Sequence, residues 1–148
     1  MIQLKKTCLF GSFIVCLTAY CAAADETTYL ISPDNTTITS SWGEQFQISD
    51  VPCDLNGNGM REFEAKLAEN ANTTHITKCD MALGYSVPKA YGNRYYAGVL
   101  WLKSPSKVSR VLLCFEEQFG NFNTEEIAQK VVTKRELIRF LLENCSHT

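Results

Sequence analysis

The stretch Tyr95–Phe115 (YYAGVLWLKSPSKVSRVLLCF) predicts the centre of the fold. Two runs rich in aromatic and branched side chains flank a short polar break that contains Pro105, a pattern typical of a β-hairpin inside a sheet. The first run is apolar on both faces, so we expect both faces to be covered. The second run alternates and places Arg110 on one face with Leu112 and Cys114.

The partner of Arg110 decides what this face of the hairpin can do, because a guanidinium on a sheet face needs a carboxylate or a phosphate. A carboxylate of the same chain, from Asp80, Glu116 or Glu117, would make the arginine structural. A phosphate partner would make it a binding residue. The sequence leaves both interpretations open.

Residues 1–24 have the pattern of a secretory signal. A basic start leads into the apolar run Cys8–Tyr20 and then into Ala22–Ala24, where small residues have Ala-x-Ala spacing. The apolar run is shorter than the ~20 residues that span a bilayer. The alternative of a lipoprotein acylated at Cys21 is opposed by the bulky side chain before it. We therefore expect cleavage after Ala24 and export.

Length and charge limit the possible partners. The 148-residue chain, with a formal net charge of −2, fits one domain once the signal is removed. Loss of Lys5 and Lys6 with the signal makes the remainder more acidic. A mildly acidic protein lacks the long-range field of a nucleic-acid binder, so any RNA contact would be a local patch. No later apolar segment approaches membrane length, so we expect no membrane partner.

Four cysteines remain after the signal: Cys53, Cys79, Cys114 and Cys145. An even number in an exported chain implies two disulfides, and four cysteines allow three connectivities that spacing cannot separate. A zinc site is the alternative, but no Cys-x-x-Cys pair is present. We predict no metal and no cofactor.

The N-terminal half predicts one helix. Residues 25–47 are rich in Thr and Ser and would supply an edge strand or a loosely packed arm. Asp54–Gly59 resembles a calcium loop, but the last ligand position falls on Ala65, so we expect a turn that caps a helix. The helix should cover Met60–Ala71, with its apolar residues on one stripe.

The C-terminal half predicts strands and a closing helix. We expect a strand over His75–Ala82, a loop or irregular edge strand over Gly84–Asn93 and a turn over Gly120–Asn123. Lys130–Lys134 should form a strand, and Arg135–Glu143 has the apolar spacing of a helix. The predicted class is α+β, with one helix packed on a curved antiparallel sheet.

From Cys53 onward the chain resembles the small fungal guanyl-specific ribonucleases, and still more their secreted, catalytically degenerate relatives, the ribonuclease-like effectors of powdery mildews. The family's motifs are matched, in order, by four segments: Tyr85–Tyr91 (YSVPKAY), Tyr95–Leu100 (YYAGVL), Ser109–Leu113 (SRVLL) and Val131–Lys134 (VVTK). The resemblance implies a ribonuclease-like domain over 51–148 behind an N-terminal extension over 25–50. It also implies the disulfides Cys53–Cys145 and Cys79–Cys114.

The resemblance also implies that ribonuclease chemistry is lost. Such enzymes need a general base, a general acid and an arginine that stabilises the phosphorane. Arg110 matches the arginine, but the carboxylate position falls on Ala97 and the acid histidine on Lys134. A lysine with an ordinary pKa of ~10.4 is a poor proton donor near neutrality. The other histidine position falls at or beside Lys89. We therefore expect no enzymatic activity.

We predict a secreted, monomeric virulence effector that binds a host protein, structured RNA or both, outside the cell or after delivery into a host cell. The candidate binding residues are Lys89, Arg94, Tyr95, Arg110 and Lys134, joined by Tyr91, Tyr96 and Arg135. These cations and aromatic rings would suit stacking and phosphate contact. Two alternatives stay open: a disulfide-stabilised binding domain of another fold, and an active secreted ribonuclease.

Overall fold

The computed structural model describes residues 28–70, 75–88, 92–118, 120–128 and 130–146. The predicted signal therefore lies outside the described residues. Within them, seven strands form one antiparallel sheet in sequence order. The strands are β1 (Tyr29–Ile31), β2 (Thr37–Ser40), β3 (Gln45–Asp50), β4 (His75–Val87), β5 (Asn93–Lys103), β6 (Val108–Glu116) and β7 (Phe122–Glu126). The helices are α3 (Asn58–Asn70) and α4 (Lys134–Asn144).

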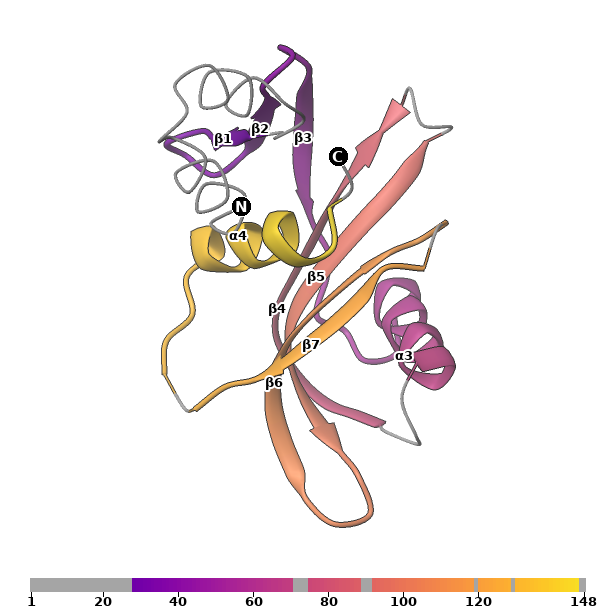
Figure 1. Ribbon diagram of the computed structural model, residues 1–148. Helices are drawn as coiled ribbons and strands as arrows, with labels where there is room; N and C mark the ends of the chain where they lie inside the picture. Colours follow the sequence, from indigo (N-terminus) through magenta and orange to yellow (C-terminus); the bar gives the residue numbers. More distant parts are fainter. Residues whose placement is uncertain (1–27, 71–74, 89–91, 119, 129, 147–148) are drawn as a thin grey trace, which may run out of the picture.

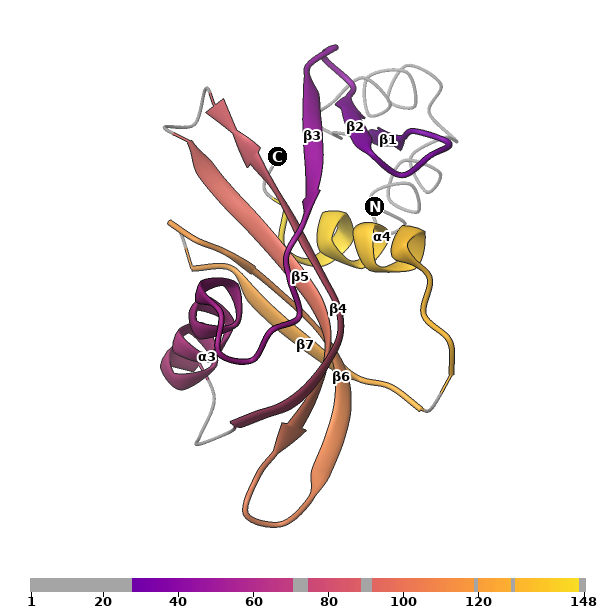
Figure 2. The same ribbon diagram turned by 180° about the vertical axis from the view of Figure 1, so that it is seen from behind.

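The sheet is curled and carries a helix on each face (Figure 1). The view from behind shows α3 and α4 separated by the long central strands (Figure 2). The predicted α+β class is confirmed, but a single packed helix was wrong, because α4 covers the second face. Among the described residues, neither helix has the length and apolar character needed to cross a membrane.

The central hairpin predicted from Tyr95–Phe115 is confirmed. β5 and β6 pair from Tyr95 opposite Glu116 to Lys103 opposite Val108. Leu113 and Phe115 pack with the buried side chains of α3, whereas Cys114 packs with those of α4. The alternation read from the sequence thus divides β6 between two cores.

α3 packs on the sheet through Met60, Phe63 and Leu67, which are all buried. A Cβ added at Gly98 would lie 2.9 Å from Cε2 of Phe63, so the close approach of helix and strand needs a glycine there. The predicted turn before the helix is present, since the Asn56 N–H donates to Oδ1 of Asp54 at 3.0 Å.

α4 begins where the predicted strand over Lys130–Lys134 was expected to run, and that strand is absent from the described residues there. Thr133 is the N-cap: the Glu136 N–H donates to its hydroxyl, and the Thr133 N–H donates to the Glu136 carboxylate. This capping box overrides the β-branched run before it. The predicted helix over Arg135–Glu143 is confirmed, and it buries Leu137, Ile138, Phe140 and Leu141.

β4 and β7 differ from the prediction. β4 continues through the predicted loop as far as Val87, paired with β5 along its length. A Cβ at Gly84 would meet the Tyr95 carbonyl oxygen at 2.6 Å, so this glycine serves a close strand contact. The predicted turn after Gly120 is only partly right, because β7 already begins at Phe122.

The N-terminal segment supplies three strands of the sheet, where an edge strand or an arm was expected. Ile38 of β2 and Phe46 of β3 belong to the core under α4. Arg135 of α4 fastens this region, because its guanidinium donates to the carbonyl oxygens of Ile31 and Ser32 at 3.2 and 3.0 Å. The segment is therefore integrated with the helix at the other end of the chain.

Two disulfides are present, as predicted, but the pairing implied by the family resemblance was wrong. The bonds are Cys53–Cys79 and Cys114–Cys145. Cys79 packs against the core under α3, whereas Cys114 and Cys145 belong to the core under α4. The sheet separates the two cores, so each disulfide joins cysteines that lie on one face.

A candidate binding groove between two diverging strands

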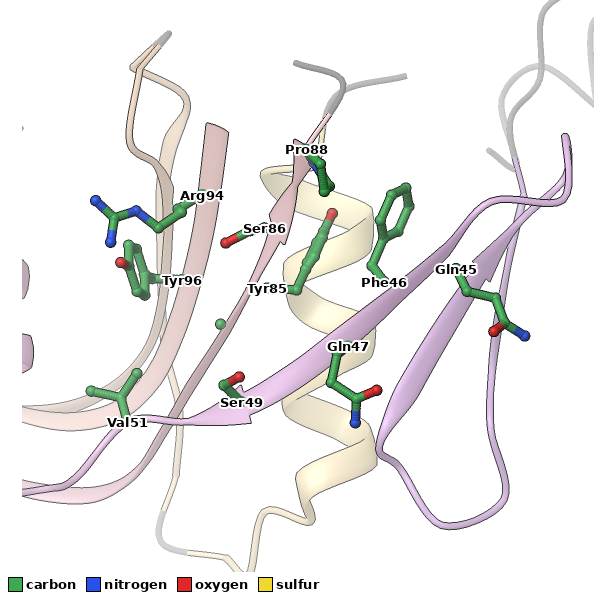
Figure 3. A pocket seen from close by; sticks show the side chains of 11 residues that line it. Gln45, Phe46, Gln47, Ser49, Val51, Tyr85, Ser86, Pro88, Arg94 and Tyr96 are labelled. Atoms are coloured by element: carbon green, nitrogen blue, oxygen red, sulfur yellow. The ribbon is translucent and has the colours of Figure 1, made fainter. Parts of the chain in front are cut away.

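β3 and β4 form a groove where they separate. They pair only from Ile48 opposite Tyr85 to Asp50 opposite Leu83, and beyond that point the strands diverge (Figure 3). The space between them is an open groove of about 560 Å³. Its polar walls consist of Gln45, Gln47, Ser49, Ser86, Arg94 and Tyr96.

The floor of the groove is aromatic. The rings of Phe46 and Tyr85 lie between the diverging strands, with α4 behind them, and their centroids are 5.6 Å apart (Figure 3). Burial raises the pKa of the Tyr85 hydroxyl far above its usual range. That hydroxyl shares a 3.0 Å hydrogen bond with Oγ of Ser146. The floor is therefore neutral, and its one buried hydroxyl is already used.

One rim of the groove carries a small charged cluster. Arg94 donates from Nε to Oε1 of Glu117 at 3.1 Å. Burial, and next the Glu117 carboxylate, raise the pKa of Glu62 on α3. Burial, followed by the charge of Glu62, also raises the pKa of Tyr96. Of the residues that the structure describes at this rim, one is a cation and two are carboxylates, so these offer no excess positive charge.

A buried hydrogen bond holds this rim in place. The Asn93 side chain donates to Oε2 of Glu116 at 2.8 Å, and both side chains are buried. The other oxygen of Glu116 has no hydrogen-bond partner among the described residues. The Gln118 N–H donates to Oδ1 of Asn93 at 3.2 Å, which fixes the chain directly after β6. The arrangement positions Glu117 beside Arg94.

Arg110, the residue on which the sequence prediction centred, is bound within the protein. Its Nε donates to Oδ2 of Asp80 at 3.1 Å, and its Nη1 donates to the carbonyl oxygens of Lys130 and Ala128 at 2.7 and 3.3 Å. The guanidinium also lies over the ring of Trp101, 5.9 Å from the centroid. Asp80 was one of the three carboxylates that the sequence offered as its partner.

The structure does not bring the predicted binding residues together. Arg94 lies on the face of α3, whereas Arg110 lies on the face of α4. The two are also ~23 Å apart along the sheet, because seven residues of β5 separate Arg94 from Trp101, the cross-strand neighbour of Arg110. Lys134 pairs with Asp50 at 3.0 Å.

The other predicted residues divide in the same way. Tyr95 is buried and stacks on Tyr85, with ring centroids 4.9 Å apart. Arg135 holds the loop after β1, and Tyr96 lines the groove beside Arg94. Lys89 and Tyr91 lie outside the described residues.

The β3 wall of the groove was not predicted from the sequence. Gln45, Phe46, Gln47 and Ile48 alternate polar and apolar along the chain, which indicates a half-buried strand with one polar face. That signal could have found the strand. It could not have found the groove, because the divergence of β3 from β4 depends on contacts distant in sequence.

Comparison of this chain with protein-family models, with curated proteins and with solved structures finds no match. The fold and the groove define an α+β protein with two disulfides and a polar groove at a break in its sheet.

Proposed function

We propose that the chain is an exported, non-catalytic protein that acts as an effector by binding a segment of a host protein in the groove between β3 and β4. The observation that carries this proposal is the groove itself: an aromatic floor between polar walls at an interrupted strand pair. Such combinations of a few polar groups around an apolar base are typical of recognition sites.

The positions matched to ribonuclease chemistry favour binding over catalysis. Ala97, at the carboxylate position, is fully buried. Lys134, at the acid position, is paired with Asp50. The guanidinium of Arg110 is occupied by Asp80 and by two backbone carbonyls, so a phosphate would have to displace three partners.

The charge of the groove favours a protein over RNA. Among the described residues of the lining, Arg94 is the one cation, and it is paired with Glu117. RNA affinity depends on unpaired cations that release counterions from phosphates. Amide, hydroxyl and aromatic side chains instead suit a peptide segment, which offers both donors and acceptors.

Selection of linear peptides from a phage-displayed library on the exported, oxidised protein tests this proposal. We expect peptides whose affinity falls at least tenfold for Ser86→Trp, which fills the groove. The matched control is Thr124→Trp on the exposed strand β7, which should bind as the wild type does. Titration with total RNA at two salt concentrations is the second arm. Failure to select any groove-dependent peptide would contradict the proposal, as would saturable, salt-dependent RNA binding that Arg94→Glu abolishes.

A further inference from the structure

The turn between β1 and β2 contains the tripeptide Asn35-Thr36-Thr37, which has the Asn-x-Ser/Thr pattern of an N-glycosylation sequon. The pattern recurs at Asn72 and at Asn144. Asn72 lies outside the described residues, so the structure allows the other two sequons to be compared. They differ in the state of the side-chain amide nitrogen, Nδ2, which is the atom that would carry the sugar.

At Asn35 the amide nitrogen is not engaged. The guanidinium of Arg135 donates from Nη1 to Oδ1 of Asn35 at 3.0 Å. A guanidinium only donates, so the amide oxygen must face it and the amide nitrogen must point elsewhere. Among the described residues, Nδ2 has no hydrogen-bond partner, and Asn35 is partly exposed. A sugar on Nδ2 would therefore leave the bond to Arg135 in place.

At Asn144 the amide and the following residue are both committed to the fold. Nδ2 of Asn144 donates to the carbonyl oxygen of Phe140 at 2.9 Å, within the last turn of α4. The Asn144 carbonyl oxygen accepts from Asn123 at 2.7 Å. The middle residue of this sequon, Cys145, is 1% exposed and is bonded to Cys114. A glycan would have to be added before that disulfide closes, so folding competes with modification here.

The conformation of the turn explains only part of the first sequon. Asn35 has a φ of 60°, a left-handed conformation that asparagine adopts more readily than most residues. This accounts for the asparagine but not for the threonine two residues later. The Thr37 N–H donates to Oγ of Ser32 at 3.0 Å, whereas the Thr37 hydroxyl has no partner among the described residues. A hydroxyl at that position is what the glycosylation pattern requires.

Resting on the export proposed above, we propose that Asn35 is the acceptor of an N-linked oligosaccharide and that Asn144 is not. The donor is a lipid-linked oligosaccharide diphosphate, the glycosyl donor of the eukaryotic secretory pathway. Nδ2 of Asn35 forms a bond to the anomeric carbon of the first sugar. The bond from that carbon to the diphosphate oxygen breaks, and the lipid diphosphate leaves with the electron pair. The amide gives up one proton to solvent, so the transfer needs no oxidant or reductant.

Mass spectrometry of the protein made in a eukaryotic secreting cell tests the assignment. An amidase that removes the glycan in heavy-oxygen water converts the modified asparagine to a labelled aspartate, and the three sequons fall in different tryptic peptides. We expect the label at Asn35 in most molecules and none at Asn144. Thr37→Ala should lose the label, whereas the matched control Thr37→Ser should keep it. Both variants leave the bond between Asn35 and Arg135 intact, which Asn35→Gln would disturb.

Two forms of the chain separate this inference from the proposed export. One form keeps residues 1–24, and the other replaces them with a secretion signal of the host cell. Label at Asn35 in the second form, with secretion of that form alone, would refute export by the chain's own N-terminal segment and leave the acceptor site intact. Unlabelled Asn35 in secreted protein would refute the site and leave export intact. Label at Asn144, or label at Asn35 that survives Thr37→Ala, would also overturn the assignment. Protein retained in the cells is measured in the same way, so a secretion defect cannot hide the result.

Discussion

The two faces of the sheet are covered to different extents, and the difference explains where the groove lies. The core under α4 draws side chains from β2 and β3 as well as from the central strands, including Ile38 and Phe46. The core under α3 draws on β4, β5 and β6 but on no residue within β3. The polar side of β3, with Gln45 and Gln47, is therefore exposed beside the diverging end of β4. The site exists because one helix covers less of its face than the other.

The two disulfides differ in burial, as the two faces of the sheet differ in coverage. Cys114–Cys145 is buried and fastens the end of α4 to β6. Cys53–Cys79 fastens the segment before α3 to β4, and Cys53 is exposed. The sequence separations, 31 and 26 residues, are similar. The chain-entropy model therefore assigns about 3.5 kcal/mol to each bond, and any difference must come from packing.

Removing each disulfide in turn gives the largest expected effects. Cys114→Ala combined with Cys145→Ala should lower the free energy of unfolding by about 4–5 kcal/mol, because the buried core also loses two packed sulfur atoms. Cys53→Ala combined with Cys79→Ala should cost about 3–4 kcal/mol. Urea unfolding of both double variants measures the difference. Greater loss from the Cys53–Cys79 bond would show that the α3 side, and not the α4 side, holds the fold.

Two arginine–carboxylate pairs, Arg110–Asp80 on the face of α4 and Arg94–Glu117 on the face of α3, give the next largest expected effects on stability. The Arg110 side chain is 11% exposed, whereas that of Arg94 is 50% exposed. Asp80→Ala strands a largely buried guanidinium and should cost about 2–3 kcal/mol. Glu117→Ala breaks a solvated pair and should cost less than about 1 kcal/mol.

Thermal unfolding of the two single variants checks this expectation. Equal losses would mean that Asp80 is not the structural partner of Arg110. The stability of Arg110→Ala must be measured together with its RNA binding. This variant also loses the hydrogen bonds to the carbonyl oxygens of Lys130 and Ala128, so weaker RNA binding could result from a destabilised fold.

The sequence predicted those features that depend on neighbouring residues. The hairpin, the face of Arg110, the helix after Asp54 and the closing helix all follow from local periodicity and capping. Lys130–Lys134 was misassigned as a strand, because its β-branched residues favour β structure. In the folded chain the capping box of Thr133 starts a helix there, and Arg110 donates to the Lys130 carbonyl oxygen. Gly84–Asn93 was predicted as a loop or irregular edge strand, because the pairing of its first residues with β5, such as Gly84 with Tyr96, is visible only in three dimensions.

The features that depend on distant contacts could not be predicted. Four cysteines allow three pairings, and only the positions of the two helices on opposite faces select one. The candidate cluster of Arg94, Arg110 and Lys134 was assembled from an expected fold, and the structure distributes its members over separate places. The groove could not be predicted, because its position depends on where the register of β3 and β4 ends.

The smallest expected effect is a pair of opposite pH dependences, one from each helix. Burial, and next Glu117, raise the pKa of Glu62 on α3, so its contribution to stability is present below the ordinary pKa of glutamate and is lost as the pH rises through the raised value. Glu62→Gln should therefore be more stable than the wild type at neutral pH, and the difference should vanish in acid.

Glu136 on α4 has the opposite sign. The Thr133 backbone N–H lowers its pKa, so its contribution is present above the ordinary pKa and is lost as the pH falls through the lowered value. Glu136→Gln should be less stable than the wild type at neutral pH, again with the difference vanishing in acid. Urea midpoints from pH 3 to pH 7 measure both, with Glu143→Gln as the control for loss of one charge. The same sign for both variants would contradict these assignments.

Amide hydrogen exchange of the unliganded protein tests the central claim most directly. If the edge of β3 that faces β4 is open where the strands diverge, the amides of Gln45 and Gln47 should exchange near their intrinsic rates. The amides of Phe46 and Tyr85, which belong to the flanking ladders, should exchange at least about a hundredfold more slowly. Protection of Gln45 and Gln47 equal to that of Phe46 and Tyr85 would mean that the ladder between β3 and β4 is closed and that no groove with an open β3 edge exists.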